Sequence, residues 1–187
     1  LERRALDQSI TQQALKQISE SAAEESATTV VYNPNWHKGV VGIVASKLIA
    51  EFYRPTIVLT KASEGEIAGS ARSVKGYDLY AAIDACSSSL IQFGGHQYAA
   101  GLRLKEENLT KFKDAFEAHV THTIATEQQE AELIYEAELD ISEIAPKLLR
   151  ILNRYRPYGP KNPQPLFIST GLKVQGPIRC IGKDQTH

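Results

Sequence analysis

The chain has 187 residues, of which 42% are hydrophobic and 23% charged, and this composition supports a buried core and excludes global disorder. Its net charge of −1 excludes an overall basic field, so any contact with nucleic acid needs a local patch of cations. The apolar runs are too short to span a bilayer. The amino-terminal residues lack a signal-peptide core, and the two cysteines are far apart without a Cys-x-x-Cys pattern. We therefore expect a cytoplasmic protein with reduced thiols.

Residues 1–26 predict a connecting helix. Apolar side chains recur at Leu6, Ile10, Ala14 and Ile18, and the opposite face is polar. This stripe would either bridge to a domain outside the sequence or pack on its own domain, and the sequence leaves both open. Because the chain lacks an initiator methionine and stops after a predicted strand, we expect it to be a fragment of a longer protein.

Residues 27–130 predict an α/β domain in which strands and helices alternate. The expected strands lie at 28–32, 56–60, 67–70 and 99–104, and the expected helices lie at 40–53, from 77 toward 93, and at 106–130. A turn is expected at 63–66, between the second and third strands. This order predicts a mixed, mostly parallel sheet flanked by helices.

The composition becomes polar and acidic near residue 130, where we place a domain boundary. Residues 131–187 predict the beginning of a small β-rich domain that the sequence leaves incomplete. Its expected elements are strands at 133–139, 166–170, 172–175 and 178–181, a helix at 140–153, and a rigid proline-rich turn region at 156–165.

Two short segments have the composition of an anion site. The first, Gly69-Ser70-Ala71-Arg72-Ser73, places a permanently charged guanidinium between two hydroxyls. The second, Gly94-Gly95-His96, places an imidazole after two glycines that allow a turn. Each segment alone is weak evidence, because an arginine at a strand end is commonly just solvated. Together they predict a phosphate site in which Ser70, Arg72, Ser73, Gly94, Gly95 and His96 contact the ligand.

A third candidate is His37, which precedes Lys38-Gly39 and a predicted helix start. Free amides and the helix dipole favour an anion there, and both side chains would add donors. The alternative is a loop histidine that packs beside Trp36. We expect no metal site in this sequence, because it has no HxH, HExxH, DxD or Asp-His-His pattern. His119 and His122 have a ligand-compatible spacing, but we do not expect them to bind metal.

Several motifs resemble the DHH-associated domain of the RecJ family, within the DHH phosphoesterase superfamily. They are Trp36 to Ser46, Arg54-Pro55, Gly69 to Ser73, Phe93 to His96, Ala99-Ala100-Gly101, Arg156 to Gly159, Asn162-Pro163 and Pro165-Leu166-Phe167. The tail is similar to the start of that family's OB-like domain, so the resemblance covers nearly the whole chain. Gly-Gly-His is shared with other DHH proteins, whereas the Trp36 to Ser46 run and the tail are more specific to RecJ.

The resemblance implies part of a metal-dependent 5′-to-3′ exonuclease that degrades single-stranded DNA in repair and recombination. It implies Mn²⁺ or Mg²⁺ held by an Asp-His-His domain that this sequence does not contain. It also implies that Ser70, Arg72, Ser73 and His96 hold DNA phosphates, with His96 as the residue nearest to a catalytic role. On this reading the chain alone is inactive and single-stranded DNA is its partner. Two alternatives are a nanoRNase or small-nucleotide phosphatase of the same superfamily, and a non-catalytic nucleic-acid-binding module.

Overall fold

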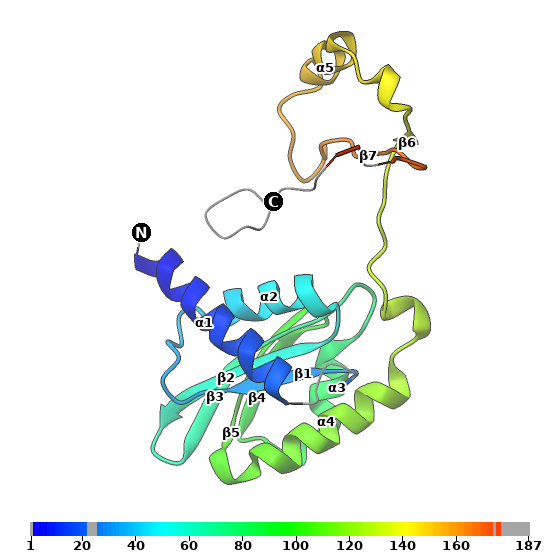
Figure 1. The fold of residues 1–187 in the computed structure, drawn as a ribbon. Helices are drawn as coiled ribbons and strands as arrows, with labels where there is room; N and C mark the ends of the chain where they lie inside the picture. Colours follow the sequence, from blue (N-terminus) through cyan, green and yellow to red (C-terminus); the bar gives the residue numbers. More distant parts are fainter. Residues whose placement is uncertain (1, 22–25, 174, 177–187) are drawn as a thin grey trace. The chain divides into compact units, whose positions relative to one another are not determined.

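The structure, a computed structural model, describes residues 2–21, 26–173 and 175–176. The chain divides into two compact units, Leu1–Ala131 and Glu132–His187, and each is described by itself (Figure 1). No helix in the described part of the chain is long and apolar enough to cross a membrane.

The first unit is built on a five-stranded sheet with the strand order β1-β2-β3-β5-β4. The strands are β1 (Thr29–Tyr32), β2 (Thr56–Ser63), β3 (Glu66–Arg72), β4 (Gln92–His96) and β5 (Ala99–Lys105). β1 and β2 are parallel, and the other three neighbouring pairs are antiparallel. The sheet is therefore mixed, as expected, but the prediction that it is mostly parallel is wrong. The turn between β2 and β3 has only two residues, and so short a connection can join only antiparallel strands.

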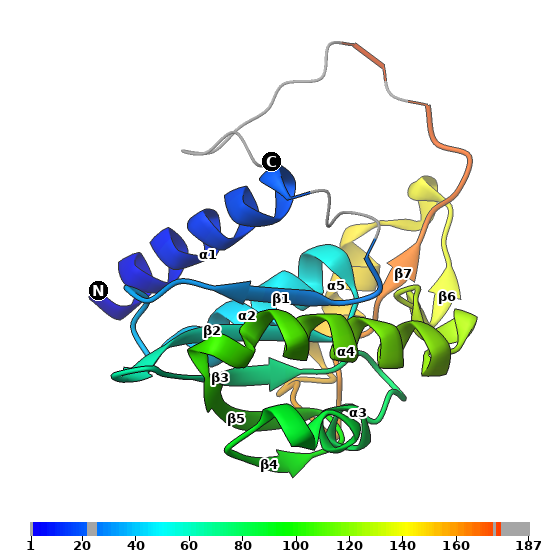
Figure 2. The same ribbon diagram turned by 90° about the horizontal axis from the view of Figure 1, so that it is seen from below.

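Helices cover both faces of this sheet (Figures 1 and 2). α1 (Glu2–Glu20) and α2 (Val41–Phe52) lie on one face, and α3 (Leu79–Ala85) and α4 (Leu109–Thr123) lie on the other. The alternation of side chains along β2 explains this division, since successive residues of a strand point to opposite faces. Val58 packs with α1 and α2, whereas Ile57 and Leu59 pack with α3 and α4.

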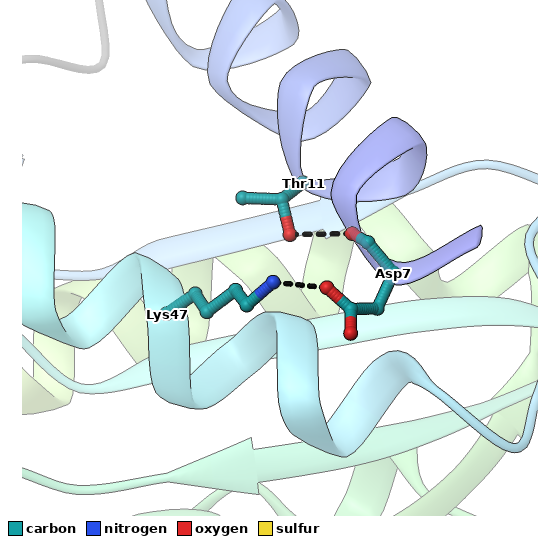
Figure 3. Close-up of polar contacts among 3 residues, drawn as sticks. All are labelled: Asp7, Thr11 and Lys47. Carbon is teal, nitrogen blue, oxygen red and sulfur yellow. Dashed lines mark hydrogen bonds and ion pairs between the residues drawn. The ribbon is translucent and has the colours of Figure 1, made fainter. Parts of the chain in front are cut away.

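α1 is part of the first unit, and most of its apolar stripe packs there. Ile10, Ala14 and Ile18 are buried against α2 and the sheet. An ion pair between Asp7 and Lys47 links α1 to α2, and the Thr11 hydroxyl donates a hydrogen bond of 2.7 Å to the Asp7 carbonyl (Figure 3).

Several predicted helices are shorter than expected, and the one predicted at 140–153 begins only at Pro146. α3 ends at Ala85 and is followed by the 3-10 turn η2 (Ser87–Ser89) and by β4. Gly94-Gly95-His96 thus belongs to a strand rather than to a turn after a helix, and the turn itself is at residues 97–98. α4 is preceded by η3 (Glu106–Asn108) and followed by η4 (Thr126–Gln128), rather than running from 106 to 130.

The second unit contains little regular structure among its described residues. Its elements are β6 (Ala137–Glu138), η5 (Ile141–Glu143), α5 (Pro146–Asn153) and β7 (Phe167–Ile168), and β6 pairs with β7 in parallel. The expected strands at 133–139 and 166–170 are thus reduced to two residues each. The described residues of 172–175 form no strand, and the strand expected at 178–181 lies outside the described residues. The proline-rich turn is held by the Asn162 amide, which donates to the carbonyls of Tyr155 and Pro157 at 2.7 and 3.0 Å.

Candidate functional site

The register of β3, β5 and β4 aligns the two predicted phosphate segments. Arg72 pairs with Ala99, and Ala99 pairs with His96 on its other side. In the next row on the same face, Gly101 pairs with a residue of each neighbouring strand, Ser70 of β3 and Gly94 of β4. Directly opposed residues of antiparallel strands share one face of the sheet. Arg72 and His96 thus occupy one row, two strands apart, with only the methyl group of Ala99 between them.

The side chains of Ser70 and Arg72 point to the α2 face of the sheet. A Cβ built on Gly42, in the first turn of α2, would lie 3.0 Å from Arg72 Nη2 and 3.4 Å from Ser70 Oγ. Arg72 Nη1 donates a 2.9 Å hydrogen bond to the Ala71 carbonyl, which uses one of its five donors. The half-buried guanidinium has no ion-pair partner within the described residues. The guanidinium lies beside the amino-terminal turn of α2, which has no side-chain cap. Its remaining donors are therefore available to an anion, which the helix terminus also favours.

His96 is exposed at the end of β4. Its Nδ1 accepts a hydrogen bond from the Tyr98 amide at 3.3 Å, and the two rings meet edge to face at 6.4 Å between centroids. In the neutral ring this leaves the proton on Nε2, which is the nitrogen available to donate to a ligand.

The two glycines before His96 have different roles. Gly95 has φ +148°, and a Cβ there would lie 2.3 Å from the Ala99 carbonyl oxygen, so the fold itself requires glycine at this position. A Cβ at Gly94 would meet nothing within 4 Å, and Gly94 is exposed. Only Gly94 leaves open sheet surface beside His96.

Three predicted site features are used by the fold itself. The Ser73 hydroxyl donates to the Tyr77 carbonyl at 2.9 Å, and the Ser73 amide donates to the Tyr98 carbonyl at 3.0 Å. The His37 ring is turned back on its own loop, where Nδ1 accepts a 3.1 Å hydrogen bond from the Gly39 amide. A Cβ at Gly69 would lie 2.0 Å from the Val58 carbonyl oxygen. Glycine at position 69 is therefore required by the close approach of strand β2.

An open groove of about 280 Å³ lies on the same face of the sheet as the row of Arg72, Ala99 and His96. Its lining includes Gln92, Gly101 and Arg103, which the sequence did not single out as ligand contacts, and Lys38, which the sequence suggested as a donor. The alternation of apolar and other residues along 99–105 could have indicated Gly101 and Arg103. Ala100, Leu102 and Leu104 are buried, so the residues between them must point to the other face of the sheet.

Two of the groups whose pKa values depart from their ordinary range lie on the α3 and α4 face of the sheet, behind the site. Burial raises the pKa of the Tyr77 hydroxyl, which hydrogen-bonds to Thr123 at 2.8 Å. Burial also raises the pKa of the Cys86 thiol. Both groups are therefore neutral near pH 7, and the charge at the site comes from its arginine and lysine side chains.

The described residues do not fit a divalent metal site. No group of three or more histidine, cysteine or acidic side chains comes together in the part of the chain that the structure describes. On α4, His122 Nδ1 lies 2.6 Å from the Ala118 carbonyl oxygen, within its own helix. We therefore assign no step through a metal ion to these residues.

Comparison with known proteins identifies both units. The DHHA1 domain family model matches residues 8–122, and the RecJ OB domain model matches residues 135–187. The chain belongs to the RecJ family. This confirms the resemblance carried by the motifs.

The relatives are named as single-stranded-DNA-specific exonucleases RecJ. The one from Bacillus subtilis is 34% identical over 191 residues, covering all of this chain and 24% of the relative. The one from Escherichia coli is 33% identical over 141 residues, covering 73% of this chain and 24% of the relative. A crystal structure of Thermus thermophilus RecJ in complex with Mg²⁺ superposes with a TM-score of 0.74 at 28% identity, covering 89% of this chain and 25% of that one. The chain thus spans about a quarter of the length of these RecJ relatives.

Proposed function

We propose that this chain is the substrate-binding part of a RecJ-type 5′-to-3′ exonuclease, which holds the phosphates of single-stranded DNA during hydrolysis. The observation that carries the proposal is the row formed by Arg72, Ala99 and His96 on an open sheet face. It places a guanidinium and an imidazole on either side of one methyl group. The RecJ OB match favours this function over a small-nucleotide phosphatase, the alternative that shares the Gly-Gly-His element.

The chemistry of the row suits a phosphate diester. The Arg72 guanidinium offers paired donors to two phosphate oxygens, and the nearby turn of α2 adds a favourable dipole. Ser70 Oγ lies on the same side, and His96 Nε2 donates from the opposite strand. These groups bind and orient the strand, and orientation of the scissile bond is itself a major contribution to catalysis.

The proposal leaves bond cleavage to groups outside the described residues. Activation of water in such an enzyme depends on Mn²⁺ or Mg²⁺, and crystal structures of RecJ in complex with each ion are among the structural relatives. We propose that the intact enzyme acts on DNA in the cytoplasm, in repair and recombination, and that this chain alone binds strand without cleaving it.

The test is binding of a 3′-fluorescein-labelled oligothymidylate, followed by fluorescence anisotropy at low salt. Arg72→Gln should weaken binding about tenfold, the contribution of one charge-assisted hydrogen-bonding group, and should lower the salt slope by about one. His96→Gln should weaken it less, because the glutamine amide keeps a hydrogen-bond donor. The control is Lys111→Gln, an exposed charge change on α4, which covers the opposite face.

Unchanged affinity in Arg72→Gln would refute the binding role of this row. Measurable cleavage of the oligonucleotide by this chain with Mn²⁺ would refute the proposal that the chain alone is inactive.

A further inference from the structure

We propose that the groove beside the phosphate row is a second nucleotide subsite, in which Lys38 and Arg103 hold a second phosphate further along the strand. This rests on the proposed function and deepens it, because it names the class of ligand. A site with two linked phosphate positions selects oligonucleotides over mononucleotides.

The register separates the two phosphate positions. Arg103 is paired with Ala68 on one side and Gln92 on the other, in the second row beyond that of Arg72. The two rows are four residues apart along strand β5, a distance of about 14 Å at the usual rise of an antiparallel strand. Arg103 Nη1 reaches toward Glu66 Oε2 at 3.6 Å, and Glu66 belongs to the row beyond that. The guanidinium of Arg103 thus leans away from that of Arg72, and the two do not share one phosphate.

Between the two rows, the surface of the groove is formed by backbone atoms of two glycines. Gly94 and Gly101 face each other across β4 and β5, and both are exposed. The nearest atom to a Cβ built on Gly101 is the Gly69 carbonyl oxygen at 3.8 Å, so neither glycine is required by neighbouring atoms. Two glycines in one row leave a flat surface on which a sugar or a base can lie close to the sheet. Their absence of side chains is then explained by a ligand rather than by packing.

The walls of the groove supply the charge that a phosphate needs. Lys38 is exposed and has no acidic partner within the described residues. The Arg103–Glu66 contact is long and partly exposed, with 43% and 33% of the two side chains accessible. Such a contact contributes little, so phosphate oxygens can replace the carboxylate. Gln92 borders the same groove from β4 and adds an amide donor and acceptor.

The experiment compares thymidine 5′-monophosphate with 5′-phosphorylated trithymidylate, titrated into this chain and followed by ¹H–¹⁵N NMR. Arg103→Gln and Lys38→Gln should each weaken the trinucleotide about tenfold and leave the mononucleotide within twofold. Gly101→Val, whose Cβ would meet no atom closer than 3.8 Å and whose methyl groups would fill the groove, should show the same selective loss. Lys111→Gln is the matched charge control. The amide spectrum of each variant verifies that it is folded.

The outcomes separate this inference from the function on which it rests. If the groove variants bind trithymidylate as the unsubstituted chain does, while Arg72→Gln loses both ligands, the second subsite is refuted and the phosphate row stands. If the groove variants lose both ligands equally, the groove belongs to the first phosphate position and the inference also fails. If Arg72→Gln binds both ligands normally, the proposed function itself is refuted.

Discussion

Gly42→Ala should stabilise the fold and weaken phosphate binding, two effects of opposite sign from one methyl group. Gly42 lies in the first turn of α2, where alanine is favoured over glycine by about 0.5–1 kcal/mol. The new Cβ would lie 3.0 Å from Arg72 Nη2, which is tighter than ordinary contact. Because Nη2 is the end of a flexible side chain, the guanidinium can shift by a few tenths of an ångström at little cost. The helix therefore gains stability while Arg72 leaves its position beside Ser70.

Two assays on one sample test this prediction. The melting temperature should rise by roughly 2–6 °C for a stabilisation of this size. Binding of the labelled oligothymidylate should weaken about threefold to tenfold, because a charge-assisted contact is lengthened rather than removed. Ser46→Ala is the matched control, since it adds helix propensity one turn later at an exposed position. It should raise the melting temperature without changing the affinity.

The reasoning fails if Gly42→Ala binds the oligonucleotide as tightly as the unsubstituted chain. That result would show that the position of the Arg72 guanidinium is unimportant to the ligand. A lower melting temperature would instead show that the guanidinium cannot move away.

Two further predictions concern the sheet and the core behind it. Gly69→Ala should destabilise the first unit by about 3 kcal/mol, because its Cβ would lie 2.0 Å from a backbone oxygen of β2. Gly94→Ala should change the free energy of unfolding by less than about 0.5 kcal/mol. Equal melting temperatures for the two variants would contradict this prediction. In a Cys180→Ser background, Cys86 should resist iodoacetamide at pH about 8.5 until the protein unfolds, because burial raises its pKa above the ordinary 9.0 and keeps the thiol protonated. Rapid alkylation of the native protein would show that the thiol is accessible.

The fold could be predicted from the sequence wherever a strand or helix buries a continuous stripe. β1, β2 and α2 were found within a few residues of their bounds for this reason. β4 was missed because its sequence, Gln-Phe-Gly-Gly-His, has no β-branched residue and pairs at the edge of the sheet. The parallel arrangement was predicted from alternation alone. The two-residue turn after Ser63 already required an antiparallel pair, so this error could have been avoided.

The candidate site depended on information that spacing along the chain does not contain. Arg72 and His96 were singled out by residue type and by family resemblance, but only the register through Ala99 brings them into one row. The sequence suggested that His37 and Lys38 could both donate to an anion at the start of α2. The structure turns the His37 ring onto its own loop and leaves the lysine at the groove.

The glycines of β4 also affect how molecules of this protein behave toward one another. β4 is an outer strand, and within the described residues it pairs only with β5. An unpaired strand edge is a template for aggregation when it is long, flat and rich in β-formers. Here the edge is five residues long and carries two glycines and no β-branched side chain, so it recruits a foreign strand poorly. The open surface proposed to receive a nucleotide therefore also helps to keep concentrated protein from self-associating through this edge.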